Sequence, residues 1–299
     1  MKNLNFFFLA ALATVFVFTS CGSDDDSIDA TDTTDLTLDI TGLQNLGADY
    51  AYEGWIMVNG DPVSTGTFTV DGVGVLTSND FQVSTANADL ATAFIVSIEP
   101  SPDADPAPAD TKILGGAINA KTGILTVAHA AALGNDFATA AGKYILATPS
   151  DGADTNENSG LWFLDNSSGT AAASLELAPL PAGWNYEGWA VIDGTPVSTG
   201  TFTTAAGVDA SALFSGTEAT PGYPGEDFLL NAPTGFTFPV DLAGMTAVIS
   251  IEPSPDNSAD PFVLKPLVGM IPAAAIDHTP YAMDNNATAT NPTGSVTIK

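Results

Sequence analysis

Two blocks of sequence each occur twice in this chain, which points to two copies of one structural unit. Residues 51–68 read AYEGWIMVNGDPVSTGTF, and residues 185–202 read NYEGWAVIDGTPVSTGTF, at an offset of 134. A second block reads VSIEPSPD at 96–103 and ISIEPSPD at 249–256, at an offset of 153. The offsets differ by 19, so the second copy carries 19 extra residues between its blocks. Repetition on this scale indicates a tandem duplication.

Short alternating segments bounded by Gly, Pro and Asp are typical of β-strands, and they fill most of the chain. The Asn59-Gly60-Asp61-Pro62 turn predicts a hairpin in the first copy. Only residues 130–141 have helical composition, and Gly134 lies inside them. The predicted strands are residues 36–40, 52–58, 63–70, 81–83, 93–99, 112–118, 123–128, 143–147, 160–164, 174–178, 184–192, 197–204, 245–252, 262–271 and 294–299.

Many short strands with almost no helix predict an all-β protein, with two tandem β-sandwich-like domains from an internal duplication. The first domain is expected over residues 36–172 and the second over residues 173–299. Residues 174–178 (SLELA) are expected to open the second domain as residues 36–40 (LTLDI) open the first. Residues 294–299 are expected to close the second domain.

The first 20 residues are expected to be a lipoprotein signal peptide. Lys2 supplies its positive charge, and residues 6–18 form an apolar run of signal-peptide length. Phe18-Thr19-Ser20-Cys21 resembles a lipobox, and Cys21 is the only cysteine in the 299 residues. A lone cysteine cannot form an internal disulfide. We therefore expect Cys21 to be lipidated and to anchor the protein to a membrane.

An acidic segment follows this cysteine. Asp24, Asp25 and Asp26 resemble the export signal that sends some Gram-negative lipoproteins to the outer face of the outer membrane. The alternative interpretation is a solvated acidic tether. Under both interpretations residues 21–35 are a flexible tether without a core. We expect an outer-membrane lipoprotein that is exposed on the cell surface.

The charge balance limits the partners of the protein. Six basic residues stand against 35 acidic ones, for a net charge of −29. Nucleic acid is excluded as a partner because phosphate binding needs a basic surface. Solubility in a salty medium explains such charge, and divalent cation binding is the alternative. His129 and His278 are too few and too scattered for a zinc site.

Calcium is the only cofactor that the sequence suggests, because several acidic residues lie in the proline-rich loops. Carboxylate oxygens are suitable calcium ligands, although loop acids are commonly just solvated. No acidic run has EF-hand spacing. The acids concerned are Asp103, Asp105, Asp110, Asp256 and Asp260.

The two tryptophans of the repeated block are expected in the core. Trp55 and Trp189 lie in the middle of predicted strands, where each can bury a large apolar area. Stacking on a sugar is the alternative, and it requires an exposed ring.

Four glutamates recur with the same blocks, as the pairs Glu53/Glu99 and Glu187/Glu252. Such carboxylate pairs serve as general acid and base in glycoside hydrolysis. We instead expect these glutamates to cap backbone N–H groups at strand ends, because a duplicated structural motif explains the recurrence without chemistry. No catalytic residue is assigned.

The insertion of the second copy is expected within residues 205–245, and it includes a loop that contains Tyr223, Glu226 and Asp227. Loops on a rigid scaffold commonly carry recognition. This loop is the predicted site of a function specific to the second copy.

The ordered set of motifs resembles the C-terminal domain of the anti-sigma-K factor family. The matching features are an aromatic-x-x-Trp strand, a Gly-x-Pro-Val turn and an apolar strand that ends in Glu-Pro. The first copy carries them at Tyr52/Trp55, Gly60/Pro62/Val63/Gly66 and Ile98/Glu99/Pro100. The second copy carries them at Tyr186/Trp189, Gly194/Pro196/Val197/Gly200 and Ile251/Glu252/Pro253.

In that family the domain lies outside the inner membrane, joined through a transmembrane helix to a cytoplasmic segment that holds a sigma factor. We expect neither of those parts in this chain. Glu-Gly also stands between its Tyr and Trp, where Gln-Leu is the commoner family pattern. The resemblance therefore implies an extracytoplasmic module and does not imply that this protein holds a sigma factor.

These observations lead to three functional hypotheses. The first is a lipid-anchored, non-catalytic module that binds an envelope or surface protein or a glycan. The second is an accessory of trans-envelope anti-sigma signalling. The third is an enzyme that acts on glycans, with Glu53 and Glu187 as its essential acids.

Overall fold

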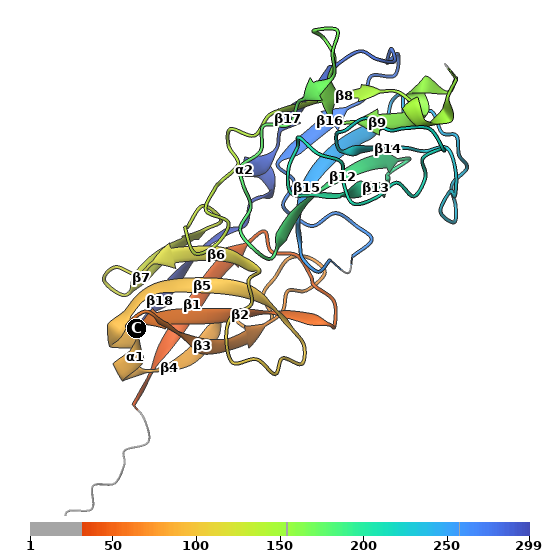
Figure 1. Ribbon diagram of the computed structural model, residues 1–299. Coiled ribbons are helices and arrows are strands. Elements are labelled where there is room, and N and C mark those ends of the chain that lie inside the picture. Colours follow the sequence, from red (N-terminus) through yellow and green to blue (C-terminus); the bar gives the residue numbers. More distant parts are fainter. Residues whose placement is uncertain (1–31, 154, 257) are drawn as a thin grey trace, which may run out of the picture.

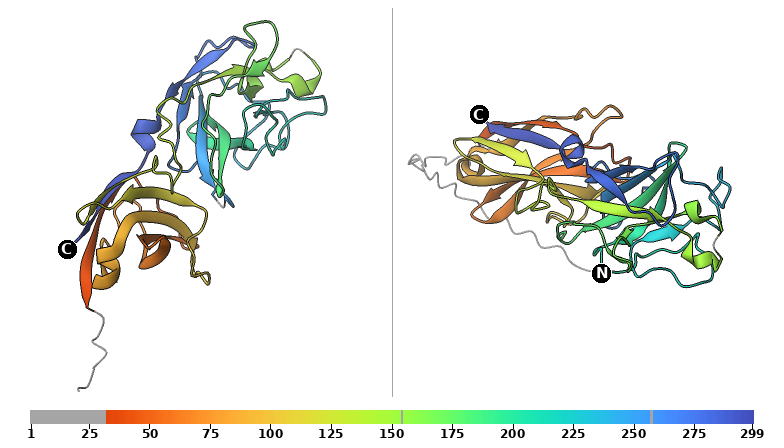
Figure 2. Two further views of the ribbon diagram at one scale, coloured as in Figure 1. Left: turned by 60° about the vertical axis from the view of Figure 1, so that its left-hand side comes forward. Right: turned by 90° about the horizontal axis from the view of Figure 1, so that it is seen from above.

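The computed structural model describes residues 32–153, 155–256 and 258–299. These residues form two eight-stranded antiparallel sheets that lie end to end (Figures 1 and 2). The predicted all-β class with two β domains is confirmed. The α-helices of the described ranges are two short ones, α1 (Thr85–Leu90) and α2 (Ala287–Thr290). None of the helices in these ranges is long and apolar enough to cross a membrane.

The first sheet contains most of the strands of the first copy and the last strand of the chain. In order across the sheet they are β3 (Asp61–Phe68), β2 (Tyr50–Val58), β5 (Ala91–Pro100), β6 (Lys112–Ala117), β7 (Thr122–Thr126), β18 (Thr293–Ile298), β1 (Thr33–Thr41) and β4 (Asp80–Ser84). The Phe68 ring at the end of β3 lies 6.1 Å from the Phe81 ring of β4. The two edges of the sheet therefore approach each other, and the sheet curls almost into a barrel.

The second sheet has the same arrangement. In order across it lie β13 (Thr195–Phe202), β12 (Trp184–Ile192), β15 (Thr246–Pro253), β16 (Leu267–Met270), β17 (Tyr281–Asn285), β8 (Gly142–Leu146), β9 (Gly160–Trp162) and β14 (Gly225–Asp227). A small hairpin of β10 (Leu164–Asp165) and β11 (Ala172–Ala173) and two 3-10 turns, η1 (Pro149–Asp151) and η2 (Glu157–Ser159), complete the described elements.

The sheets do not divide where the sequence placed the boundary between the domains, at residues 172 and 173. Strands β8 and β9 lie within the predicted first domain but belong to the second sheet. Strand β18 was expected to close the second domain, and it lies in the first sheet between β7 and β1. Residues 174–178 form no strand, and β9 takes the place in the second sheet that β1 has in the first. Alternation identifies a strand but does not identify its neighbours.

The repeated hairpins have the predicted turn. Asn59 and Gly60 both have positive φ, 55° and 96°, as a type I′ turn requires. Asp193 and Gly194 repeat this at 50° and 84°. Residues 130–141, which had helical composition, contain turns and no helix. Gly134 lies there with φ of 71°, outside the helical region.

Candidate functional site

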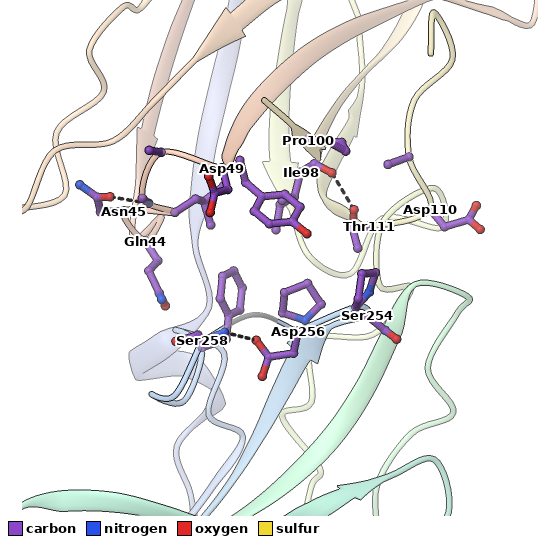
Figure 3. A pocket seen from close by; sticks show the side chains of 18 residues that line it. Gln44, Asn45, Asp49, Ile98, Pro100, Asp110, Thr111, Ser254, Asp256 and Ser258 are labelled. Carbon is purple, nitrogen blue, oxygen red and sulfur yellow. Dashed lines mark hydrogen bonds between the residues drawn. The ribbon is translucent and has the colours of Figure 1, made fainter. Parts of the chain in front are cut away.

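A cleft of about 590 Å³ lies where the two sheets meet (Figure 3). Residues 44–50, in the loop between β1 and β2 and the start of β2, form one wall. The end of β5 and residues 109–111 form a second wall, and the segment after β15 faces both. Ile98 and Phe262 add apolar surface. The sequence did not predict this cleft, because it is built by loops that come together only through the packing of the two sheets.

The cleft joins equivalent parts of the two copies. Pro100 comes from the Glu-Pro-Ser-Pro-Asp sequence of the first copy, and Pro253 to Asp256 come from the same sequence in the second. In Figure 3 the two segments lie on opposite sides of the opening. The repeated block therefore supplies both sides of this site.

A buried chain of hydrogen bonds braces the cleft loop of the first copy. Trp55 Nε1 donates to Ser97 Oγ at 2.7 Å, and the Ser97 hydroxyl donates to the Glu99 carboxylate. Glu99 then accepts the backbone N–H of Ala109 at 2.9 Å. Ala109 lines the cleft. The expected capping role of Glu99 is confirmed by this bond.

The second copy repeats the same chain of bonds. Trp189 Nε1 donates to Ser250 Oγ at 2.7 Å, and the Ser250 hydroxyl donates to the Glu252 carboxylate. Glu252 accepts the backbone N–H of Phe262 at 2.9 Å, and Phe262 lines the cleft. Trp55 and Trp189 are each only 2% exposed, as expected for core residues. Their rings are therefore not available for stacking on a sugar.

The tyrosines of the motif brace further loops. Tyr52 donates its hydroxyl to the Gln44 carbonyl at 2.8 Å, and Gln44 lines the cleft. Tyr186 donates to the Ala178 carbonyl at 2.6 Å. Both rings are buried. The repeated motif thus has an internal role, which is to hold loops, and the loop held by Tyr52 lines the cleft.

The four motif glutamates are all buried, with at most 9% of each exposed. Glu53 accepts a hydrogen bond from the Ser64 hydroxyl, and Glu187 accepts one from Ser198. None of the four lines the cleft. Each of the four therefore has a structural hydrogen-bond partner in the described part of the chain.

Burial perturbs these acids. The pKa of Glu187 is raised to about 7, mainly by burial, although the Ser198 bond lowers it. The pKa of Glu252 is raised to about 7 for the same reason, against the lowering effect of its bonds to Ser250 and Phe262. Burial also raises the pKa of Glu99. Near neutral pH a large part of the Glu187 and Glu252 population therefore stays protonated.

The predicted recognition loop is only partly accessible. Glu226 and Asp227 are fully buried. Asp227 accepts the Trp162 indole N–H at 2.7 Å and the Ser150 backbone N–H at 2.8 Å, so it ties neighbouring loops together. Tyr223 is half-buried and lines a separate cavity of about 340 Å³. The prediction that Glu226 and Asp227 contact a ligand is wrong, because neither side chain is accessible from the surface.

Two of the acids considered for calcium, Asp110 and Asp256, line the cleft. The described part of the chain contains no group of three or more His, Cys, Asp or Glu side chains placed to hold a metal ion. Cys21, Asp24, Asp25 and Asp26 lie outside the described residues.

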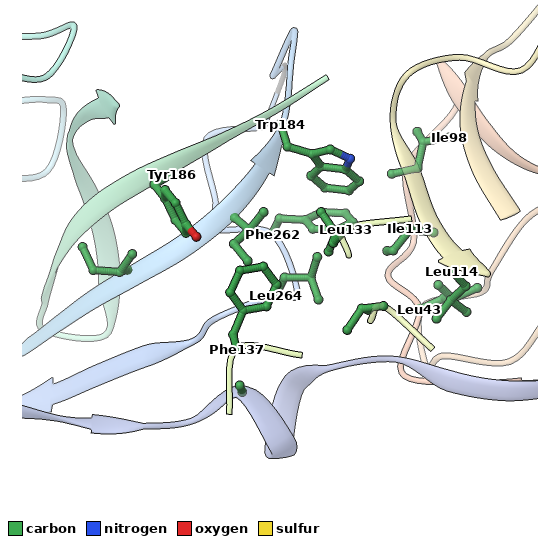
Figure 4. Close-up of a cluster of buried hydrophobic side chains, with 14 of the residues drawn as sticks. Leu43, Ile98, Ile113, Leu114, Leu133, Phe137, Trp184, Tyr186, Phe262 and Leu264 are labelled. Carbon is green, nitrogen blue, oxygen red and sulfur yellow. The ribbon is translucent and has the colours of Figure 1, made fainter. Parts of the chain in front are cut away.

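Apolar packing lies next to the cleft and joins the two sheets (Figure 4). Trp184 of β12 is 3% exposed, and its ring lies 6.0 Å from that of Phe262. Ile113 and Leu114 of β6 belong to the same continuous hydrophobic core. The cleft is therefore formed over a packed junction.

Comparison with known proteins gives a match to part of the chain. A family model described as the C-terminal part of anti-sigma-K factor rskA matches residues 10–113. No curated protein and no solved structure matches the chain. The matched residues include β1 to β5 and the start of β6, and with them the first copies of both repeated blocks. Residues 10–113 are thus similar to the C-terminal domain of the anti-sigma-K factors, a family of regulatory proteins.

Proposed function

We propose that this protein is a lipid-anchored, non-catalytic binding module outside the cytoplasm, and that its ligand binds in the cleft between the two sheets. The main support for this proposal is that the walls of the cleft come from both copies of the duplicated unit. Equivalent proline-rich segments of both copies meet there, and the buried Trp–Ser–Glu bonds of each copy hold them in place. Preformed concave sites of this size are typical of ligand binding.

A photo-crosslinking amino acid in place of Asp110 tests the site on intact cells. Asp110 is exposed and lines the cleft, so we expect a covalent adduct with an envelope protein or glycan. The same amino acid in place of Ile124, which is 72% exposed and does not line the cleft, serves as the matched control. Addition of Ser254→Trp, which fills the cleft, should remove the adduct. An adduct that survives Ser254→Trp, or forms equally from position 124, contradicts the proposal.

The anchor and the location have their own test. Cys21→Ala should release the protein from the membrane fraction. Protease added to intact cells should digest the wild-type protein, whereas replacement of Asp24, Asp25 and Asp26 by Ala should protect it. Protection of the wild type under these conditions would show that the acidic segment is only a tether.

The family match favours a second candidate function, as an accessory of trans-envelope anti-sigma signalling. Co-purification of the full-length protein with an inner-membrane regulator is the expected result under this proposal. Exposure of the protein on the cell surface would contradict this second candidate function.

A further inference from the structure

We propose that the gap between β1 and β7 is a strand-acceptor site, filled by β18 of the same chain and able to take this strand from a second copy of the protein. The acceptor site is defined by β1 and β7 on either side, and the donor by residues 293–298.

Because β9 has the position in the second sheet that β1 has in the first, the first copy is counted here as β1 to β8 and the second as β9 to β18. With this division, the order of strands shows that the two copies exchange their last strands. Strand β8 follows β7 in the chain, yet it pairs with β17 and β9 in the second sheet. Strand β18 follows β17, yet it pairs with β7 and β1 in the first sheet. The two strands occupy the same position in their sheets. Each sheet is therefore completed by a strand from the other copy.

The contact between β18 and its acceptor site is extensive. Six residues of β18 face β1, from Thr293 opposite Thr41 to Ile298 opposite Leu36. Val296 and Ile298 are buried at 0% and 3% exposure. Without β18, two interior strands would expose unpaired backbone N–H and C=O groups, which are templates for another strand. The site thus provides both ladder bonds and apolar pockets for alternate side chains.

The two connections that carry the exchanged strands cross beside each other at the junction. Asn285 Nδ2 donates to the Phe137 carbonyl at 2.8 Å and to the Ala140 carbonyl at 2.9 Å. Asn291 Nδ2 donates to the Asp136 carbonyl at 2.8 Å. This is the arrangement of a strand-swapped dimer, with both partners in one chain. The covalent link raises the effective concentration of the donor strand but adds nothing to the contacts that the strand makes. The same contacts are therefore open to β18 of a second copy when the protein concentration is high.

Cysteine pairs in the full-length Cys21→Ala protein test the exchange within one chain. Asp39 of β1 faces Ser295 of β18. Asp39→Cys with Ser295→Cys should therefore form an intramolecular disulfide that changes migration on a non-reducing gel. The matched control combines Ser295→Cys with Ala282→Cys, because an unexchanged β18 in the place of β8 would set residue 295 opposite residue 282, where Lys143 now lies. A disulfide in the control pair and none in the first overturns the proposal.

A chain that ends at Asn291 tests the acceptor site with a strand supplied from outside. Amide hydrogen exchange should show loss of protection in β1 and β7, with protection retained in β12 and β15. A peptide of residues 292–299 should restore protection in β1 and β7, and the same peptide with Val296→Asp and Ile298→Asp should not. The proposal is overturned if β1 and β7 stay protected without the peptide, or if the peptide leaves a folded truncated chain unchanged.

If the truncated chain does not fold, exchange of β18 between copies is tested with two full-length variants. Asp39→Cys and Ser295→Cys, each in the Cys21→Ala background, are mixed, unfolded in urea and refolded together at high concentration. We expect a disulfide-linked heterodimer, at a yield well above the homodimers formed by either variant alone. Monomers only, or a yield equal to those homodimers, overturns the exchange between copies.

Discussion

The glycines in the two Tyr-Glu-Gly-Trp sequences leave no room for a side chain. A Cβ on Gly54 would lie 2.5 Å from Thr65 Oγ1 and 2.6 Å from the Phe94 ring. A Cβ on Gly188 would likewise lie 2.6 Å from the Phe163 ring. The aromatic ring comes from β5 in the first sheet and from the residue after β9 in the second. The same steric requirement is thus met by different parts of the chain.

Gly54→Ala and Gly188→Ala should each lower the free energy of unfolding by about 1–3 kcal/mol, the usual cost of overpacking a core. Urea denaturation measures this difference. Gly72→Ala is the matched control, since its Cβ would meet nothing within 4 Å. Equal stability of all three variants and the wild type would contradict the packing of the repeated motif described above.

Buried carboxyls should make the protein more stable in mild acid than at neutral pH. The pKa values of Glu187 and Glu252 rise from 4.5 to about 7 on folding, so the native state binds more protons than the unfolded state between these values. Stability therefore falls as pH rises through this window. One pKa unit corresponds to about 1.4 kcal/mol, so each group contributes on the order of 3 kcal/mol to the fall.

Urea denaturation at pH 5 and pH 8 measures this difference for the wild type and for Glu252→Gln. The variant carries a neutral side chain of the same shape, so its stability should depend less on pH. Glu218→Gln, at an exposed position, should keep the wild-type dependence. An unchanged pH dependence in Glu252→Gln would contradict the burial argument.

At the level of elements, one carboxylate fastens the insertion of the second copy. Asp209 Oδ2 accepts the backbone N–H of Gly225 at 2.8 Å, and burial raises its pKa to about 7. Asp209→Ala should release residues 205–224 and speed their cleavage in limited proteolysis several-fold. Glu218→Ala, in the same segment and exposed, should be cleaved at the wild-type rate. Equal rates for both variants would show that other contacts hold the insertion.

Most strands could be predicted because their apolar alternation is strong, as in residues 52–58 and 184–192. Strand β17 (YAMDN) and strand β14 (GED) could not, because they are short and polar and become strands only through their neighbours. Residues 174–178 alternate well but have no neighbour strand, apart from one bridge between Ala141 and Glu176. Whether these segments become strands depends on pairing with segments that are distant in the sequence. The local pattern of apolar and polar residues does not contain that information.

The same limit applies to the candidate site. The tryptophans and glutamates of the motif were visible as a repeat, and the expected burial of Trp55 and Trp189 is confirmed. Their link to the cleft runs through backbone N–H groups of Ala109 and Phe262, which carry no sequence signal. The repeated Glu-Pro-Ser-Pro-Asp sequence was the available clue, since equivalent strand ends can be brought together by a duplicated fold.

At the level of the whole molecule, the two sheets should unfold together. Their core is continuous across the junction, and each sheet contains a strand from the other copy. Calorimetry should show one transition, with equal calorimetric and van't Hoff enthalpies. Trp184→Ala, at the junction, should lower the midpoint of that single transition and cost about 3–5 kcal/mol. Two separate transitions in the wild type would contradict the coupling.

Under the proposed function, the position of β1 also sets how the protein would bear a mechanical load. The chain enters the fold at the start of β1, and the far end of β1 leads into the loop of residues 44–50 at the cleft. A pull between an anchor before β1 and a ligand in the cleft acts along this strand. Strand β1 is bonded to β18 on one side and to β4 on the other, so such a pull shears both ladders at once and does not unzip them bond by bond. Under the proposed function, a strand with a ladder on each side therefore lies on the line between the anchor and the ligand.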